Sequence, residues 1–247
     1  MSRSRYCALI PAFQAEETIG EVVSRVKAQG LDVVVVDDGS RDRTAAAAAT
    51  HGALVISHLR NRGKGSALRT GFAYALRERY DGVVVLDSDG QHDPAEIPRL
   101  IEAGERQHAG LVVGNRMADG LPAAPPARPE RSTTGGGAAQ GGVAMPPTRR
   151  WVNAAMSTII SQLIRQRIPD SQCGFRVIRK ELLADVPLTA ARFEIESEVL
   201  LSAARRRWKI ISVPVTSIYR DQASHIRPLL DTLRFLRLVA RFLLWRR

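Results

Sequence analysis

The chain has 247 residues, of which 45% are hydrophobic, 25% charged and only 5% aromatic. These fractions are typical of globular proteins and exclude a disordered, collagen-like or coiled-coil chain; the length allows one large α/β domain or two small ones. The net charge is +11, and residues 205–247 carry eleven Lys or Arg against two Asp, so the other 204 residues are nearly neutral. A basic C-terminal segment predicts an anionic partner: nucleic acid, acidic lipid headgroups or a phosphorylated ligand.

The cysteines and the apolar runs bear on the cellular compartment in which the protein is expected. Cys7 and Cys173 are too few for a disulfide scaffold and lack metal-ligand spacing, which favours a reducing cytoplasm. The apolar run near the N-terminus is about eight residues long and has no cleavage site after it, so it predicts a first strand rather than a signal peptide. No stretch approaches the roughly 18 apolar residues of a membrane span.

The first half of the chain alternates short apolar runs with segments of helical character. The runs predict strands at 7–13, 32–38, 53–59, 82–89 and 110–116. Helices are predicted at 16–29, in a short stretch after Asp42, at 64–80 and at 94–107. Runs such as VVVV do not alternate in polarity, so both faces of the sheet must be covered by helices. This is typical of an α/β fold with a doubly wound, mostly parallel sheet.

Residues 119–148 break this pattern, because twelve of the thirty are Gly or Pro. We predict a flexible surface insert there. After it, the sequence predicts a helix at 151–165, a strand running into a helix from Cys173, a helix at 195–207, a strand at 209–215 and a final helix at 228–245.

The final helix is amphipathic. At 100° per residue its arginines (Arg227, Arg234, Arg237 and Arg241) fall within an arc of about 80°. Five leucines lie on the other side: Leu229, Leu233, Leu236, Leu243 and Leu244. This pattern fits a helix lying in a membrane interface, and it fits equally a helix packed on its own domain with a solvated basic face.

Two acidic clusters follow predicted strands. VVVVDDGS contains Asp37 and Asp38, and VVVLDSDGQHDP contains Asp87, Asp89 and Gln91. Such residues commonly end strands and cap helices, so either cluster alone means little. Because the carboxyl ends of parallel strands form the ligand crevice of an open α/β sheet, two clusters in one half-domain predict a binding site.

The second cluster predicts a divalent cation. Asp87 and Asp89 are one residue apart, so a turn can aim both carboxylates at Mg²⁺ or Mn²⁺, which completes its shell with water and substrate phosphates. The partner would be a nucleotide diphosphate. The sequence has no P-loop and no GxGxxG after the first strand, and NRGKG at 61–65 reads as the turn into a helix.

Seven segments together resemble a known family. IPAFQAEETIG, VVVVDDGSRDRT, NRGKGSALRTGF, VVVLDSDGQHDP, GNRM, PDSQCGFRVI and FEIESEVL occur in the order typical of family 2 glycosyltransferases of the GT-A fold. Within that family the chain most resembles the dolichyl- and polyprenyl-phosphate sugar transferases, dolichol-phosphate mannose synthase among them. The resemblance spans the whole chain except 119–148.

The resemblance implies a division of the chain and a metal-dependent transfer with inversion. Residues 1–118 would form the nucleotide-sugar half of one GT-A domain, 149–222 the acceptor half, and 223–247 the basic amphipathic helix. The donor would be a UDP- or GDP-linked sugar and the acceptor a polyprenyl phosphate at an anionic surface on the cytoplasmic face of a membrane. The choice of nucleotide and sugar, and a membrane protein partner, stay open.

The resemblance also implies residue roles. Pro11 and Asp38 would contact the nucleotide, with Asp37 in support. Asp87, Asp89 and Gln91 would hold the metal and the diphosphate, and Arg116 and Arg220 would bind phosphate groups. Asp170 and the CGFR segment at 173–176 would line the acceptor side. The catalytic set would then be Asp89, Arg116 and Asp170.

The acceptor decides whether a base is needed. A lipid phosphate is mostly a dianion at neutral pH and needs little help, whereas a hydroxyl acceptor needs a carboxylate such as Asp170, Glu196 or Glu198. The alternative function is therefore a soluble family 2 transferase acting on a sugar or small-molecule hydroxyl. A nucleic-acid-binding protein is disfavoured, because no recognition motif is present and the acidic clusters would have no purpose.

Overall fold

In the part of the chain that the structure describes, seven strands form a single sheet in the order β3-β2-β1-β4-β6-β5-β7. The computed structural model describes residues 4–117, 147–217 and 228–244. The strands are β1 (Tyr6–Ala12), β2 (Asp32–Asp37), β3 (Leu54–Ser57), β4 (Gly82–Val85), β5 (Leu111–Asn115), β6 (Arg176–Arg179) and β7 (Ile210–Pro214). Each lies within, or within one residue of, a segment that the sequence predicts to be a strand.

The sheet is parallel except for one strand. β1 pairs in parallel with β2 and β4, β2 with β3, and β5 with β7. β6 runs antiparallel to both of its neighbours, β4 and β5. The predicted mostly parallel sheet is therefore confirmed. Strands from residues 1–118 and from 149–222 alternate within it, because β6 lies between β4 and β5.

The helices agree with the predicted segments, with shifted ends. They are α1 (Ile19–Lys27), α2 (Thr44–Thr50), α3 (Lys64–Arg77), α4 (Ile97–Arg106), α5 (Pro147–Ile164), α6 (Lys180–Asp185), α7 (Ile195–Arg205) and α8 (Pro228–Leu244), with a 3₁₀ turn η1 (Pro94–Glu96) before α4. One boundary was wrong. The last two residues of the predicted insert, Pro147 and Thr148, open α5, since proline suits the first turn of a helix. The rest of the insert lies outside the described residues.

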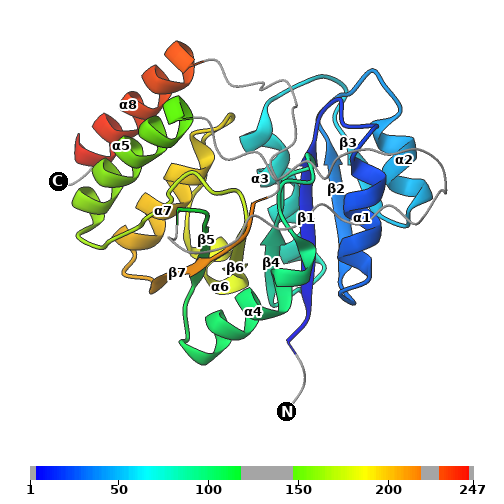
Figure 1. Ribbon diagram of the computed structural model, residues 1–247, viewed down its shortest axis with the longest axis horizontal. Helices are drawn as coiled ribbons and strands as arrows, with labels where there is room; N and C mark the ends of the chain where they lie inside the picture. Colours follow the sequence, from blue (N-terminus) through cyan, green and yellow to red (C-terminus); the bar gives the residue numbers. More distant parts are fainter. Residues whose placement is uncertain (1–3, 118–146, 218–227, 245–247) are drawn as a thin grey trace, which may run out of the picture.

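Helices cover both faces of the sheet (Figure 1). α3 lies against Leu9 of β1, where a methyl group on Gly71 would overlap the leucine side chain. α4 lies on the opposite face, where Gly104 approaches Val112 of β5. α5 and α8 lie at one end of the molecule in Figure 1, and both contact α7. This doubly wound arrangement explains the unbroken valine runs, whose side chains are buried on both sides.

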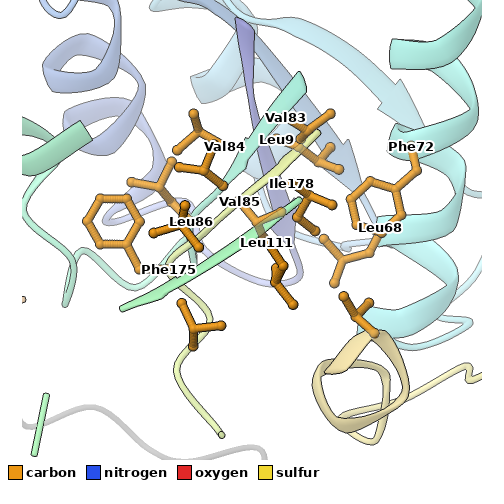
Figure 2. Close-up of a cluster of buried hydrophobic side chains, with 14 of the residues drawn as sticks. Leu9, Leu68, Phe72, Val83, Val84, Val85, Leu86, Leu111, Phe175 and Ile178 are labelled. Atoms are coloured by element: carbon orange, nitrogen blue, oxygen red, sulfur yellow. The ribbon is translucent and has the colours of Figure 1, made fainter. Parts of the chain in front are cut away.

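The core is built mainly from aliphatic side chains of the central strands. Figure 2 shows Leu68 and Phe72 of α3 beside Leu9, Val85 and Ile178 of the sheet, all of them buried. Burial of this apolar surface supplies most of the free energy that holds α3 in place. The position of α3 matters below, because its first residue reaches the candidate site.

The C-terminal helix has two apolar faces. Phe235 and Leu238 are buried and belong to the core, whereas Leu233, Leu236, Leu243 and Leu244 are 45%, 51%, 45% and 79% exposed. Its basic face is partly engaged, because Arg241 forms a 2.6 Å ion pair with Glu198 of α7. α8 is therefore packed on the domain and at the same time presents leucines outward. None of the described helices is long and apolar enough to cross a membrane.

We predict that Gly71→Ala lowers the free energy of unfolding by about 1–3 kcal/mol, because the new methyl group overfills the contact with Leu9. Denaturant unfolding of Gly71→Ala, Leu9→Ala and the double variant measures this. The smaller side chain at position 9 makes room, so the double variant should be more stable than the sum of the single effects by at least about 0.5 kcal/mol. Strictly additive effects would contradict the contact.

Candidate active site

The candidate site lies where the parallel strands end. Asp38 follows β2, Asp87 and Asp89 follow β4, and Arg116 follows β5. β6 runs the other way, so it begins at this same edge and brings residues 170–176 to it. The strand directions therefore bring segments far apart in sequence to one edge, as the sequence predicts for a ligand site of an open α/β sheet.

Asp38 fixes the loop in front of α3. Its carboxylate accepts hydrogen bonds from the backbone N–H groups of Arg62 (2.9 Å) and Gly63 (2.6 Å) and contacts His58 Nδ1 at 2.7 Å. His58 Nε2 in turn lies 2.9 Å from the Thr70 hydroxyl on α3. Asp38 thus ties β2 to the NRGKG turn. This role was missed by the sequence analysis, and the predicted contact with a nucleotide stays a prediction.

Asp37 and Pro11 are buried beside Asp38. Asp37 accepts a hydrogen bond from the backbone N–H of Ser40 (3.1 Å), which shapes the DDGS turn. Pro11 lies opposite Val36 in the pairing of β1 with β2. Both residues therefore support the end of β2, and the nucleotide-binding roles predicted for them stay predictions.

Asp87 is held between two cationic or polar partners. Lys64, the first residue of α3, places its Nζ 2.6 Å from Asp87 Oδ1 and 2.6 Å from Glu196 Oε1 of α7. His92 Nε2 lies 3.3 Å from Asp87 Oδ2. Burial alone would raise the pKa of Asp87, but the charge of Lys64 and the contact with His92 hold it well below its usual range. Asp87 is therefore ionised at neutral pH.

Asp89 has the opposite electrostatic setting. Burial and the neighbouring charge of Asp87 raise the pKa of Asp89 above its usual value. Its Oδ1 accepts the backbone N–H of Gln91 at 2.9 Å, which closes the turn after β4. Two carboxylates crowded on one turn repel each other, and a cation between them would relieve that repulsion.

These residues fit a divalent cation that takes some of its ligands from the protein and the others from a substrate and water. Among residues 4–117, 147–217 and 228–244, no group of three or more His, Cys, Asp or Glu side chains is arranged to hold a metal. The turn after β4 carries two carboxylates, those of Asp87 and Asp89, and Gln91 comes two residues later in the sequence. Mg²⁺ and Mn²⁺ commonly bind through one or two carboxylates and take the remaining ligands from water and phosphate oxygens.

Arg116 and Asp170 form a buried, bidentate ion pair. Arg116 Nε and one terminal nitrogen donate to the two Asp170 oxygens at 2.7 and 3.0 Å. The Asp170 side chain is fully buried and that of Arg116 is 5% exposed. Burial would raise the pKa of Asp170, but the Arg116 charge holds it below its usual value. Arg116 and Asp170, to which the resemblance gives roles in the site, are thus brought together and form an ion pair with each other.

The segment before β6 is held by a second buried arginine. Arg176 donates to the backbone carbonyls of Ser171, Cys173 and Glu196 at 2.6–2.8 Å. A methyl group on Gly174 would overlap the Asp87 carboxylate, so the CGFR segment lies directly against the acidic turn. The predicted acceptor segment therefore adjoins the predicted metal ligands. Arg220 lies outside the described residues.

Lys64 is the main residue that the sequence analysis missed. NRGKG was correctly predicted as the turn into a helix, but the lysine within it was given no role. The glycines on either side of it were a local signal of close approach to another segment, here the backbone at 190–191. The partners of the lysine come from β4 and α7, which only the fold brings together.

Residues 7–186 match the model of glycosyl transferase family 2. The chain belongs to this family. It is therefore a glycosyltransferase, as predicted, and the matched residues include the acidic turns, the NRGKG turn and Arg116–Asp170.

Curated relatives extend over most of the chain. It is 28% identical to the UDP-N-acetylglucosamine–dolichyl-phosphate N-acetylglucosaminyltransferase of Methanococcus voltae, over 86% of this chain and 85% of that protein. It is 27% identical to the undecaprenyl-phosphate mannosyltransferase of Micrococcus luteus, over 88% and 85%. It is 28% identical to the polyprenol monophosphomannose synthase of Mycolicibacterium smegmatis, over 88% and 78%.

A solved structure confirms the fold. Glucosyl-3-phosphoglycerate synthase from Mycobacterium tuberculosis, crystallised with Mn²⁺, uridine diphosphate and phosphoglyceric acid, superposes with a TM-score of 0.68 at 22% identity. The alignment covers 98% of this chain and 78% of that chain. The GT-A architecture predicted from the sequence is therefore confirmed, with its mostly parallel sheet and C-terminal helix.

We predict that Asp170→Ala lowers the free energy of unfolding by about 3–5 kcal/mol, because it leaves the Arg116 guanidinium buried without its counter-ion. Urea denaturation measures this loss. Replacing exposed Glu102 by Ala is the control and should change stability by less than about 0.5 kcal/mol. If Asp170→Ala is as stable as the wild type, the ion pair does not hold this edge of the site.

Proposed function

We propose that the chain transfers a sugar from a nucleotide-diphosphate sugar to the phosphate of a polyprenyl phosphate, with inversion, while bound peripherally to the cytoplasmic face of a membrane. The observation that carries this proposal is the state of the candidate bases. Two of the three carboxylates considered as a base are bound to an arginine, Asp170 to Arg116 and Glu198 to Arg241, and Glu196 is bound to Lys64 before substrate arrives. A phosphate acceptor needs no such base.

The donor side of the proposal rests on the acidic turn. Asp87, Asp89 and Gln91 would hold a divalent cation, which supplies charge that stabilises the leaving nucleotide diphosphate. The chain's own contribution is orientation, because Lys64 and His92 fix the Asp87 carboxylate before substrate arrives. Asp38 holds the neighbouring turn rigid, and the nucleotide would bind along this edge beside Pro11 and Asp37. UDP- and GDP-linked donors both fit this description.

The acceptor side rests on the relatives and on surface chemistry. Three relatives are named for transfer to dolichyl, undecaprenyl or polyprenol phosphates. The outward leucines of α8 supply an apolar surface, and exposed Trp151 and Val152 lie on α5, which like α8 packs on α7. Exposed Arg237 on α8 would meet anionic headgroups. Such a surface would bring the site to an acceptor confined to the membrane.

We predict that radiolabelled UDP- or GDP-sugars transfer label to polyprenyl phosphate in vesicles with Mg²⁺ or Mn²⁺, and that EDTA abolishes transfer. Asp89→Asn should reduce the rate at least about a hundredfold, because the leaving diphosphate loses its charge stabilisation. Extraction of labelled lipid into organic solvent measures it. Asp89 is a cleaner target than Asp87, whose replacement also removes one of the two carboxylate partners of Lys64.

The control for this experiment is Glu102→Gln, which removes a carboxylate from an exposed position on α4 and should leave transfer unchanged. Circular dichroism checks that Asp89→Asn is folded. Label appearing in a water-soluble product without added lipid would overturn the lipid acceptor and favour a hydroxyl acceptor. Full transfer in EDTA would overturn the metal requirement.

We further predict that Leu236→Ser with Leu243→Ser weakens binding to anionic vesicles by at least about tenfold, because both exposed side chains would enter the lipid interface. Co-sedimentation with vesicles measures binding, and unfolding stability should stay within about 0.5 kcal/mol. Leu238→Ser is the matched control: it lies on the same helix but is 7% exposed, so it should destabilise the fold instead. Unchanged sedimentation of the double variant would contradict the membrane face.

A further inference from the structure

Lys64 occupies an unusual electrostatic position. Its ammonium group lies 2.6 Å from carboxylate oxygens of both Asp87 and Glu196, and its side chain is only 16% exposed. Asp89, two residues beyond Asp87, adds a third carboxylate to the same turn. The single positive charge of Lys64 therefore serves two direct carboxylate partners and adjoins a third acidic group.

The backbone around Lys64 is rigidly held. Gly63 has φ +96°, a conformation that favours glycine, and its N–H is bound by Asp38. A methyl group on Gly63 or Gly65 would overlap the backbone at 190–191, so the start of α3 is pressed against that segment. The main chain of Lys64 therefore stays in place, and its long side chain is the part that can move.

A second observation points to a ligand at this cluster. Glu196 is 8% exposed, yet its Oε2 is buried with no hydrogen-bond partner among the described residues. Buried carboxylate oxygens are normally satisfied, so an unpartnered one marks a place where a further cation or donor would bind. The oxygen belongs to the same carboxylate that Lys64 contacts.

We propose that Lys64 is the resident counter-ion of Asp87 and Glu196, that a divalent cation binds Asp87 only by displacing it, and that the displaced ammonium then binds the donor diphosphate. This rests on the proposed metal-dependent use of a nucleotide-diphosphate sugar. Lys64 contacts Asp87 Oδ1 and His92 contacts Oδ2, so both oxygens of this carboxylate already have partners. A divalent cation that binds beside Oδ1 is repelled by the ammonium at short range, which favours departure of Lys64. The diphosphate offers the released lysine a new anionic partner.

The proposal has a thermodynamic consequence. The cation alone must break the ion pairs of Lys64, whereas the cation together with a nucleotide diphosphate gives Lys64 a replacement partner. Metal and nucleotide should therefore strengthen each other's binding, and by linkage the factor is the same in both directions. Lys64 is a positioning residue for the cation and a direct ligand of the diphosphate.

The experiment measures Mn²⁺ affinity by isothermal titration or electron paramagnetic resonance, with and without UDP or GDP, for the wild type and Lys64→Met. We expect Lys64→Met to bind Mn²⁺ alone at least about tenfold more tightly than the wild type, because its competitor is gone. In Lys64→Met, UDP or GDP should increase the Mn²⁺ affinity by a smaller factor than in the wild type. Only the part of that increase that comes from direct contact between phosphate and metal should remain. The measured quantity is Mn²⁺ binding, so the result does not depend on transfer activity.

Two matched variants serve as controls. Arg77→Met removes one positive charge from the exposed end of the same helix and should leave Mn²⁺ affinity unchanged. Lys64→Arg keeps the charge and should bind Mn²⁺ alone as weakly as the wild type. Because Lys64→Met removes the ammonium partner of two carboxylates, it is also tested by thermal unfolding, where Mn²⁺ should raise the melting temperature more than in the wild type.

Equal or weaker Mn²⁺ binding by Lys64→Met, or a nucleotide effect as large as that of the wild type, overturns the role of Lys64 and leaves the proposed function intact. A wild-type protein that binds Mn²⁺ neither alone nor with UDP or GDP overturns both. Tighter binding in Lys64→Met together with a smaller nucleotide effect supports the displacement.

Discussion

The buried Asp38 carboxylate joins the end of β2 to the turn before α3 at the edge of the sheet where the candidate site lies. It accepts the N–H groups of Arg62 and Gly63 and, through His58, reaches Thr70 on α3. Because those contacts fix the residues immediately before α3, they also fix the backbone position of Lys64 and hence which groups its side chain can reach. From there Lys64 contacts both Asp87 and Glu196. Loss of a buried carboxylate with several donors leaves those donors unsatisfied, so this part of the site depends on one residue.

Compensated buried charge is the common feature of the site. Arg116 is matched by Asp170, Lys64 by Asp87 and Glu196, and Arg176 by three backbone carbonyls. Such groups add little net stability compared with apolar packing, but removing one partner is costly. They restrict the segments that carry them to one arrangement. The site that we propose to receive a highly charged diphosphate is thus held in shape by charges that already have partners.

The C-terminal helix links this site to the proposed membrane surface. α8 packs on α7 through Phe235 and Leu238, and Arg241 is bonded to Glu198 of that helix. Two residues earlier on α7, Glu196 contacts Lys64 in the site. α7 therefore contacts α8, the helix with the outward-facing leucines, and through Glu196 it also takes part in the acidic cluster around Lys64. The packing gives a fixed spatial relation between the surface that would meet lipid and the residues that would perform transfer.

The sequence alone determined the strands, most helices and the fold class, because the unbroken valine runs require helices on both faces and the 3.6-residue periodicity marks the helices. It also located Asp37, Asp38, Asp87, Asp89 and Gln91 at strand ends, since the position of a turn is a local property. The partners of these residues were decided by the tertiary structure. That β6 runs antiparallel, that Arg116 meets Asp170 across 54 positions, and that Lys64 joins Asp87 to Glu196 depend on contacts between distant segments. Local propensity carries no information about such pairings, because they arise only when strand order and helix packing bring the segments together.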